Sequence, residues 1–113
     1  MYRLKHHKTL KPEKWFAYSM GQQIMMTANE MNRAQNWIAK QAGREADLCY
    51  ERAFELIDLT IEDPKWKGRL RELLRFREVV GELYTAEKKN GDVNRLAMDC
   101  LIKLNAEAYN MLH

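Results

Sequence analysis

The sequence is poor in the residues that end regular secondary structure. Among its 113 residues there are only five glycines and two prolines. Because these two residue types supply many of the backbone angles that turns require, their scarcity argues against a chain of many short elements. We therefore expect a few long elements joined by short connections.

Cysteine is equally scarce, since Cys49 and Cys100 are the only two and lie far apart in the sequence. Neither belongs to a CxxC pair, which excludes the common zinc and dithiol motifs. Both fall at apolar positions of a predicted helix. We therefore predict two buried thiols in a protein of a reducing compartment.

Catalytic and metal-binding motifs are missing as well. The three histidines, His6, His7 and His113, lie near the chain ends, and none completes the Glu-x-x-His pair of a di-iron bundle. The chain contains no phosphate-binding GxxxxGK[ST], dinucleotide-binding GxGxxG or nucleophilic GxSxG motif. The sequence therefore predicts no catalytic residue, no metal site and no cofactor.

Long apolar runs are also absent from the sequence. No stretch approaches the roughly 18 consecutive apolar residues of a membrane helix. The basic start of the chain is not followed by the apolar run of a signal peptide. We therefore expect a cytoplasmic protein without a membrane partner. The net charge of +3 is too small to identify a nucleic-acid-binding protein by itself.

What the sequence does contain is four apolar stripes with the spacing of an α-helix. We predict helices over residues 12–41, 44–62, 65–89 and 93–112. The stripes of the second and fourth helices are Ala46, Cys49, Tyr50, Ala53, Leu56, Ile57 and Thr60, and Val93, Ala97, Cys100, Leu101, Leu104, Ala108 and Met111, the latter widened by Leu96.

The ends of these helices carry recognisable signals. Gly43 predicts a left-handed stop after the first helix. Asp63 precedes Pro64 and therefore avoids the helical region, which ends the second helix. Asn90 and the glycine after it close the third, and Asp92 is the predicted N-cap of the fourth.

Short connections between helices favour antiparallel neighbours. The predicted fold is therefore all-α: a single up-down-up-down four-helix bundle over residues 12–113, preceded by a basic amino-terminal tail over residues 1–11.

Four charged residues interrupt the apolar rows. Arg77 stands in the row of the predicted third helix. Arg52 and Glu55 lie on a flank of the second helix, and Glu30 lies on a flank of the first. Because buried charge is tolerated only when it is paired, we expect Arg77 to meet Glu55 or Glu30 across the bundle. This polar network either sets the register of the helices or forms a polar pocket.

A basic cluster marks the start of the predicted third helix. It comprises Lys65, Lys67, Arg69, Arg71 and Arg75, with Trp66 among them. Cations beside an aromatic side chain can hold a phosphate backbone, so this cluster is a candidate nucleic-acid-binding surface. The alternative is a solvated face, because acidic residues are interspersed with these cations.

Aromatic and apolar surface exceeds what a small bundle can bury. Trp15, Tyr18 and Met25 form a stripe beside the main seam of the predicted first helix. Apolar area rimmed by polar residues is typical of an interface, so we predict self-association through this stripe, most simply as a dimer. The competing interpretation is that tryptophans such as Trp37 and Trp66 cover the ends of the bundle.

Residues 51–65 form a distinctive run, which reads ERAFELIDLTIEDPK. Residues 14–16 (KWF), 36–37 (NW) and 75–78 (RFRE) accompany it. Together these segments resemble a group of short uncharacterised prokaryotic helical proteins, and the resemblance extends from residue 14 to about residue 84. It implies no activity and no catalytic residue.

At the level of the fold alone, the chain is similar to small four-helix-bundle accessory proteins, including those that accompany reverse transcriptases in diversity-generating retroelements. That similarity implies a basic oligomer that binds nucleic acid and a partner enzyme.

Three functions are compatible with these features. The first is a non-enzymatic interaction module, a small helical bundle that self-associates and binds a protein partner. The second is a nucleic-acid-binding accessory protein that uses the basic cluster. The third is an enzyme with a pocket of Glu and Arg side chains. Because no nucleophile or motif supports the third, we expect the first.

Overall fold

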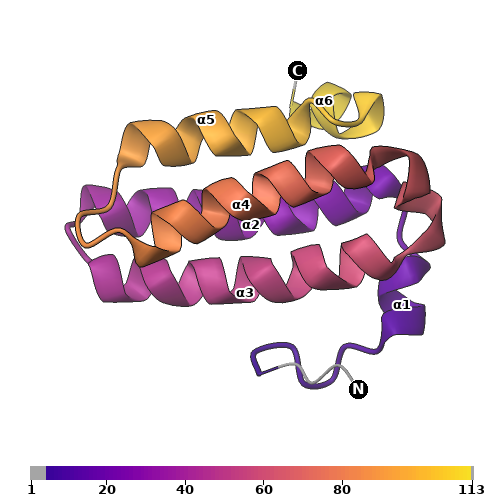
Figure 1. Ribbon diagram of the computed structural model, residues 1–113, viewed down its shortest axis with the longest axis horizontal. Coiled ribbons are helices and arrows are strands. Elements are labelled where there is room, and N and C mark those ends of the chain that lie inside the picture. The colour runs from indigo at the N-terminus through magenta and orange to yellow at the C-terminus, as the bar shows by residue number, and fades with distance from the viewer. Residues whose placement is uncertain (1–4, 113) are drawn as a thin grey trace.

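The computed structural model describes residues 5–112, and this part of the chain is helical without any strand (Figure 1). Its elements are α1 (Pro12–Phe16), α2 (Met20–Ala39), α3 (Gly43–Glu62), a 3₁₀ helix η1 (Pro64–Arg69), α4 (Leu70–Thr85), α5 (Gly91–Ile102) and α6 (Ala106–Leu112). The prediction of an all-α protein is confirmed. Within the described range, no helix is both long enough and apolar enough to cross a membrane.

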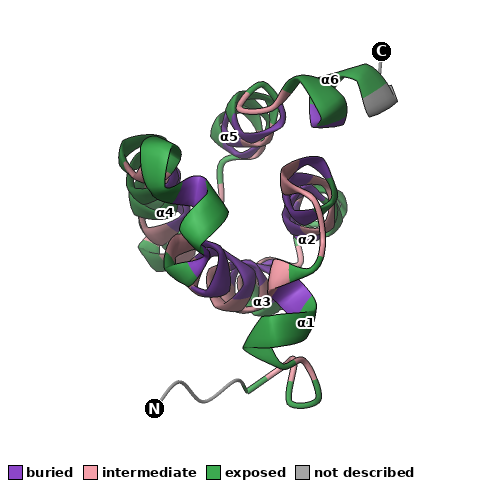
Figure 2. Ribbon diagram, turned by 90° about the vertical axis from the view of Figure 1, so that its right-hand side faces the viewer, coloured by how far each residue is buried: buried purple, intermediate pink, exposed green. Residues whose placement is uncertain are grey.

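The four longest helices surround one apolar core. α2 packs against α3 and α5, α3 packs against α4, and α4 packs against α5. Figure 2 looks along these helices and shows that most of their buried positions face the interior. The short α1 contacts α3, and α6 contacts α2. Met31, Tyr50 and Val80 lie in this core without exposed surface.

The predicted first helix is divided, because a capping box starts a new helix in its middle. Ser19 Oγ accepts a hydrogen bond from the backbone N–H of Gln22 at 3.1 Å. In return, Gln22 Oε1 accepts one from the backbone N–H of Ser19 at 2.9 Å. These two bonds satisfy donors that a helix start leaves free. α1 can therefore leave the axis of α2 and lie against α3.

The predicted second helix agrees closely with α3, but the stop before it was assigned to the wrong residue. Gln41, with φ of 59°, is the residue in the left-handed region. Gly43 is already the first residue of α3. A glutamine in the left-handed region costs a small amount of free energy, and the packing of the two helices that it connects offsets this cost.

The predicted third helix is shorter than expected and begins differently. Its first residues form η1, where the side chain of Asp63 accepts a hydrogen bond from the backbone N–H of Lys65 at 3.1 Å. Gly68 lies inside η1 and weakens regular α-helix there. α4 then runs from Leu70 to Thr85.

The predicted fourth helix is divided into α5 and α6. Asn90, rather than Asp92, is the N-cap of α5, since its side chain accepts a hydrogen bond from the backbone N–H of Val93 at 3.1 Å. After α5, the side chain of Asn105 accepts one from the backbone N–H of Glu107 at 2.9 Å. An asparagine that satisfies the free donors of a new helix favours a break at this position.

A lysine side chain caps the end of α4. Lys89 Nζ donates hydrogen bonds of 2.7–3.0 Å to the carbonyl oxygens of Leu83, Tyr84 and Ala86. It also lies 2.7 Å from Asp47 Oδ1 on α3. The cation satisfies carbonyls that a helix end leaves without partners, and it compensates the negative end of the helix dipole. This almost fully buried ammonium therefore connects α4 to α3.

The variant Lys89→Met tests this cap, because methionine keeps an apolar stem but removes the ammonium. We expect the free energy of unfolding to fall by about 1–3 kcal/mol, the usual cost of leaving buried polar groups without a partner. Urea denaturation followed by circular dichroism measures the change. The exposed neighbour provides the control Lys88→Met, which should change stability by less than about 0.5 kcal/mol. Equal stability of the two variants would contradict the capping role.

Candidate functional site

The apolar stripe of α5 is only partly covered by the rest of the protein. In α3, all seven residues of the predicted stripe are buried. In α5 the stripe is covered only in part: Ala97 and Leu101 are buried, whereas Leu96 is 64% exposed and Val93 is 38% exposed. Cys100 is exposed too, so the prediction that both thiols are buried is wrong for Cys100.

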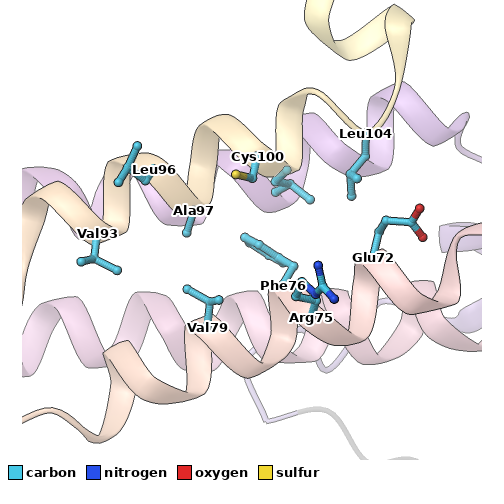
Figure 3. A pocket seen from close by; sticks show the side chains of 10 residues that line it. Glu72, Arg75, Phe76, Val79, Val93, Leu96, Ala97, Cys100 and Leu104 are labelled. Atoms are coloured by element: carbon cyan, nitrogen blue, oxygen red, sulfur yellow. The ribbon is translucent and has the colours of Figure 1, made fainter.

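These uncovered side chains form one wall of a groove between α4 and α5, which we call the α4–α5 groove (Figure 3). Its volume is about 350 Å³. Glu72 and Arg75 on α4 are its charged residues. Its apolar lining includes Phe76 and Val79 from α4, Val93, Leu96 and Cys100 from α5, and Leu104 from the residues after α5.

The lining of the groove suits packing better than bond-making chemistry. Two helices supply its walls, and most side chains that reach it are aliphatic or aromatic. A groove of this kind accepts the apolar face of another helix. Glu72 and Arg75 are placed to select the orientation of such an occupant through charge.

The structure brings together two members of the predicted polar network. Arg52 Nε on α3 donates a hydrogen bond of 2.8 Å to Glu30 Oε2 on α2. Arg33 Nη1 donates one of 2.8 Å to the other oxygen of the same carboxylate. Glu30 is buried, and the two guanidinium groups satisfy both of its oxygens. The pair therefore holds α2 against α3.

Arg52 also lies beside the buried thiol of Cys49, at 3.2 Å from Nη2 to Sγ. Burial raises the pKa of that thiol, although the positive charge of Arg52 opposes the effect. A thiol with a raised pKa is protonated near neutrality and is a poor nucleophile. Cys49 is therefore a structural residue of the core.

The position predicted for Arg77 is wrong. Its side chain is 44% exposed, and the neighbouring Phe76 occupies the core instead. Arg77 Nε donates a hydrogen bond of 2.7 Å to Asp58 Oδ1, and the guanidinium lies 5.1 Å from the centre of the Phe54 ring. The carboxylate that receives it is thus Asp58, where Glu55 or Glu30 was expected.

Glu55 holds the amino-terminal segment onto α3. Its carboxylate accepts hydrogen bonds of 2.7–2.9 Å from the backbone N–H groups of Lys5, His6 and His7. The ring nitrogen Nδ1 of His7 lies 2.8 Å from the same carboxylate. Partial burial raises the pKa of Glu55, but these hydrogen bonds outweigh that effect, and the net pKa is lowered. The segment predicted as a basic tail is therefore attached at residues 5–7.

The basic cluster is mostly on the surface. Lys67 and Arg69 in η1 are exposed, as are Arg71 and Arg75 in α4. Lys65 is used differently, since its Nζ pairs with Asp63 and donates a hydrogen bond of 2.9 Å to the carbonyl oxygen of Phe16. All five cations are exposed, but Lys65 is held by its partners and fixes the end of α1.

The predicted interface stripe is not exposed as a unit. Trp15 is fully buried and donates a hydrogen bond of 3.1 Å from Nε1 to Thr60 Oγ1 on α3. Tyr18 is partly buried, with its ring in a T-shaped arrangement with the ring of Trp15, and Met25 is partly buried against the main core. The prediction that Trp15 lies in an exposed interface is wrong, because the break before Ser19 lets α1 fold onto α3.

A buried hydrogen-bond network around Gln23 was missed by the sequence analysis. Gln23 Nε2 donates to the carbonyl oxygen of Trp15 at 2.9 Å and to Asp63 Oδ2 at 2.8 Å. Its Oε1 accepts from Trp66 Nε1 at 2.6 Å. A signal was present, because Gln23, Thr27 and Glu30 recur at helical spacing, and all three are buried.

A second buried network centres on Asn94 of α5. Its Oδ1 accepts a hydrogen bond of 2.7 Å from the hydroxyl of Tyr50. Its Nδ2 donates to the carbonyl oxygen of Met31 at 3.0 Å and to Gln35 Oε1 at 2.8 Å. Burial raises the pKa of Tyr50, which keeps the hydroxyl protonated as the donor. This network fixes α5 against α2 and α3.

Neither a metal-binding cluster nor a similar protein indicates a function for this chain. Across residues 5–112, no group of three His, Cys, Asp or Glu side chains is placed to hold a metal ion. Comparison of the chain with protein-family models, with curated proteins and with solved structures found no match. The function must therefore be inferred from the geometry of this chain.

Attachment of the amino-terminal segment should depend on pH. Because the pKa of Glu55 is lowered in the folded state, its contribution to stability is complete above the ordinary value of 4.5 and is lost as the pH falls through the lower, folded-state pKa. We expect Glu55→Gln to lower the free energy of unfolding at pH 7 by about 1.5–3 kcal/mol, the range for hydrogen bonds to a charged group. The loss should shrink in strongly acidic buffer.

Urea denaturation of the wild type and Glu55→Gln at the two pH values measures this difference. The exposed Glu87, which lies between α4 and α5, provides the control Glu87→Gln. A stability loss for Glu55→Gln that is the same in acid as at neutrality would show that the carboxylate charge does not hold the segment.

Proposed function

We propose that this protein is a non-enzymatic interaction module that docks the apolar face of a helix in the α4–α5 groove. The observation that carries the proposal is the exposure of Leu96, at 64%, in the middle of an apolar groove. A single exposed leucine is common on protein surfaces, but an exposed leucine within a contiguous apolar groove is typical of an interaction site. A helix that enters the groove would cover Leu96 together with Val93 and Cys100.

The spacing of these three residues supports a helical occupant. Val93, Leu96 and Cys100 recur at intervals of three and four, which places them in one row along α5. Val79 and Phe76 form the facing wall on α4. Two parallel apolar walls with a trough between them are the arrangement that receives an amphipathic helix.

The polar residues also support a structural rather than a catalytic account. Glu30 and Arg52 pair with each other, Glu55 binds the amino-terminal segment, and Arg77 binds Asp58. Each of these charges has a structural partner. A pocket enzyme would instead need charged groups directed at a substrate.

We also infer that α2, α3, α4 and α5 form an up-down-up-down four-helix bundle, with α1 and α6 as short terminal pieces. The order of packing, in which each of the four contacts the next, supports this arrangement. In such a bundle the α4–α5 groove is a seam between two adjacent helices.

The groove can be tested with a synthetic amphipathic helical peptide that carries leucines on one face. The protein, labelled at its amino terminus and held at nanomolar concentration, is titrated with the peptide while fluorescence anisotropy is recorded. We expect Leu96→Glu to weaken binding by about ten-fold or more, because burying one leucine contributes about 1.5–3 kcal/mol.

Leu74 provides a matched control. It is another exposed leucine, at 52%, and it lies on α4 outside the lining of the groove. The variant Leu74→Glu should therefore bind the peptide as the wild type does. If the wild type does not bind, or if Leu96→Glu and Leu74→Glu bind equally, the groove is not a docking surface.

A second candidate function is nucleic-acid binding through the basic cluster. The observation that favours it is the exposure of Lys67, Arg69, Arg71 and Arg75 along η1 and the start of α4. Charges on a phosphate backbone would be neutralised by these cations with release of counterions.

Binding of a labelled single-stranded RNA across a salt series tests this second function. If it is correct, the double variant Lys67→Glu with Arg69→Glu should weaken binding at low salt by about ten-fold or more, and the dependence of affinity on salt should become less steep. These two positions lie outside the α4–α5 groove, so peptide binding should not change. RNA binding that is absent at low salt, or unaffected by the double variant, would reject this function.

A further inference from the structure

We propose that the occupant of the α4–α5 groove is a second copy of this chain, placed antiparallel across a two-fold axis so that α4 runs beside the α4 of the partner. This inference rests on the proposed docking function of the groove and adds the identity, direction and register of the occupant.

The inference begins from a row of charges on α4. Arg71, Arg75, Glu78 and Glu82 are all exposed. Their spacing of four, three and four residues places them on one flank of the helix. Arg75 lines the α4–α5 groove, so this flank forms its edge. We call these four residues the α4 charge row.

The α4 charge row contains two pairs of like charges. Arg71 and Arg75 are like charges four residues apart, and so are Glu78 and Glu82, which destabilises a helix. The spacing of Arg75 and Glu78, three residues apart, compensates for only part of this repulsion. Arg71 lies in the first turn of α4 and Glu82 in its last turn, so these two charges also oppose the helix dipole. Among residues 5–112, no ion pair joins any of the four to an opposite charge.

In an antiparallel dimer, each charge of the α4 charge row would face an opposite charge of the second copy. The midpoint between Arg75 and Glu78 along α4 lies between residues 76 and 77. The midpoint between Arg71 and Glu82 lies at the same place. When α4 is turned end for end about that point, Arg71 faces the partner's Glu82 and Arg75 faces the partner's Glu78. Both pairs form in one register, and two-fold symmetry repeats each of them. A parallel second copy would instead place like charges together.

The surface beside the charge row supplies apolar contact for the same arrangement. α4 and α5 lie side by side in Figure 1, and the whole molecule extends over 37 by 34 Å in that view. A molecule of this size is wide enough for the area of about 800 Å² that each partner buries in a typical stable interface. Leu96 lines the groove and is 64% exposed. The apolar groove would supply affinity, and the charge row would set orientation and register.

Analytical ultracentrifugation over a range of protein concentrations tests the second copy. We expect the wild type to form a dimer, and we expect two charge variants to raise its dissociation constant by about ten-fold or more. One variant, Arg71→Glu with Arg75→Glu, makes the row entirely acidic. The other, Glu78→Lys with Glu82→Lys, makes it entirely basic. An equimolar mixture should restore a dimer, which also shows that both variants are folded.

Single substitutions test the register. A mixture of Arg75→Glu with Glu78→Lys replaces an ion pair by the reversed pair, and it should dimerise. A mixture of Arg75→Glu with Glu82→Lys leaves two carboxylates opposite each other, and it should dimerise less well by a measurable factor. Equal dimerisation of the two mixtures would overturn the antiparallel register.

The outcomes separate this inference from the proposed function. A wild type that remains monomeric at high concentration overturns the second copy, and the docking function still stands if the helical peptide binds and Leu96→Glu weakens it. A dimer that is insensitive to both the charge row and Leu96→Glu lies on another surface, which also overturns the inference. Restoration in the mixed variants supports it.

Discussion

The packing of α5 between α2 and α4 is the contact on which the proposed function depends. α5 touches these two long helices, and they bury Ala97 and Leu101. Its apolar stripe is wider than the strip that these neighbours cover, so Leu96 and Cys100 remain in contact with water. Because the Asn94 hydrogen bonds hold α5 to α2 and α3, the helix cannot rotate to bury them without breaking that network.

The fold was predictable where apolar periodicity was continuous. Ala46, Cys49 and Tyr50 begin a stripe that predicted α3 closely, because that helix is covered on several sides and its hydrophobic pattern is unambiguous. The breaks at Ser19 and Asn105 were not predicted. The side-chain caps at these two residues favour a helix break by only a small free energy. The spacing of the apolar residues does not reveal such a small difference.

The candidate site was predictable only in part. The sequence placed Glu30 and Arg52 in one candidate polar network, since a charge at a helix flank requires a counter-charge. It expected Arg77 as the partner of Glu30 or Glu55, whereas Arg52 is the residue that pairs with Glu30. It misplaced Arg77 by one position relative to Phe76, because the buried row of α4 runs through Leu73, Phe76, Val80 and Leu83 and not through the neighbouring row that contains Arg77. The exposure of Leu96 could not be predicted, since it depends on how far α4 lies from α5.

Cys100 offers the most direct measurement of whether the α4–α5 groove is a docking surface. It lines the groove, while the buried Cys49, whose pKa is raised by burial, serves as an internal reference of low reactivity. The quantity to measure is the rate at which a small thiol reagent modifies Cys100 in the folded protein, from low to high protein concentration. The account predicts rapid modification in dilute solution and protection as the groove becomes occupied. A Cys100 rate that is the same at every concentration, and unchanged by a saturating helical peptide, would contradict it.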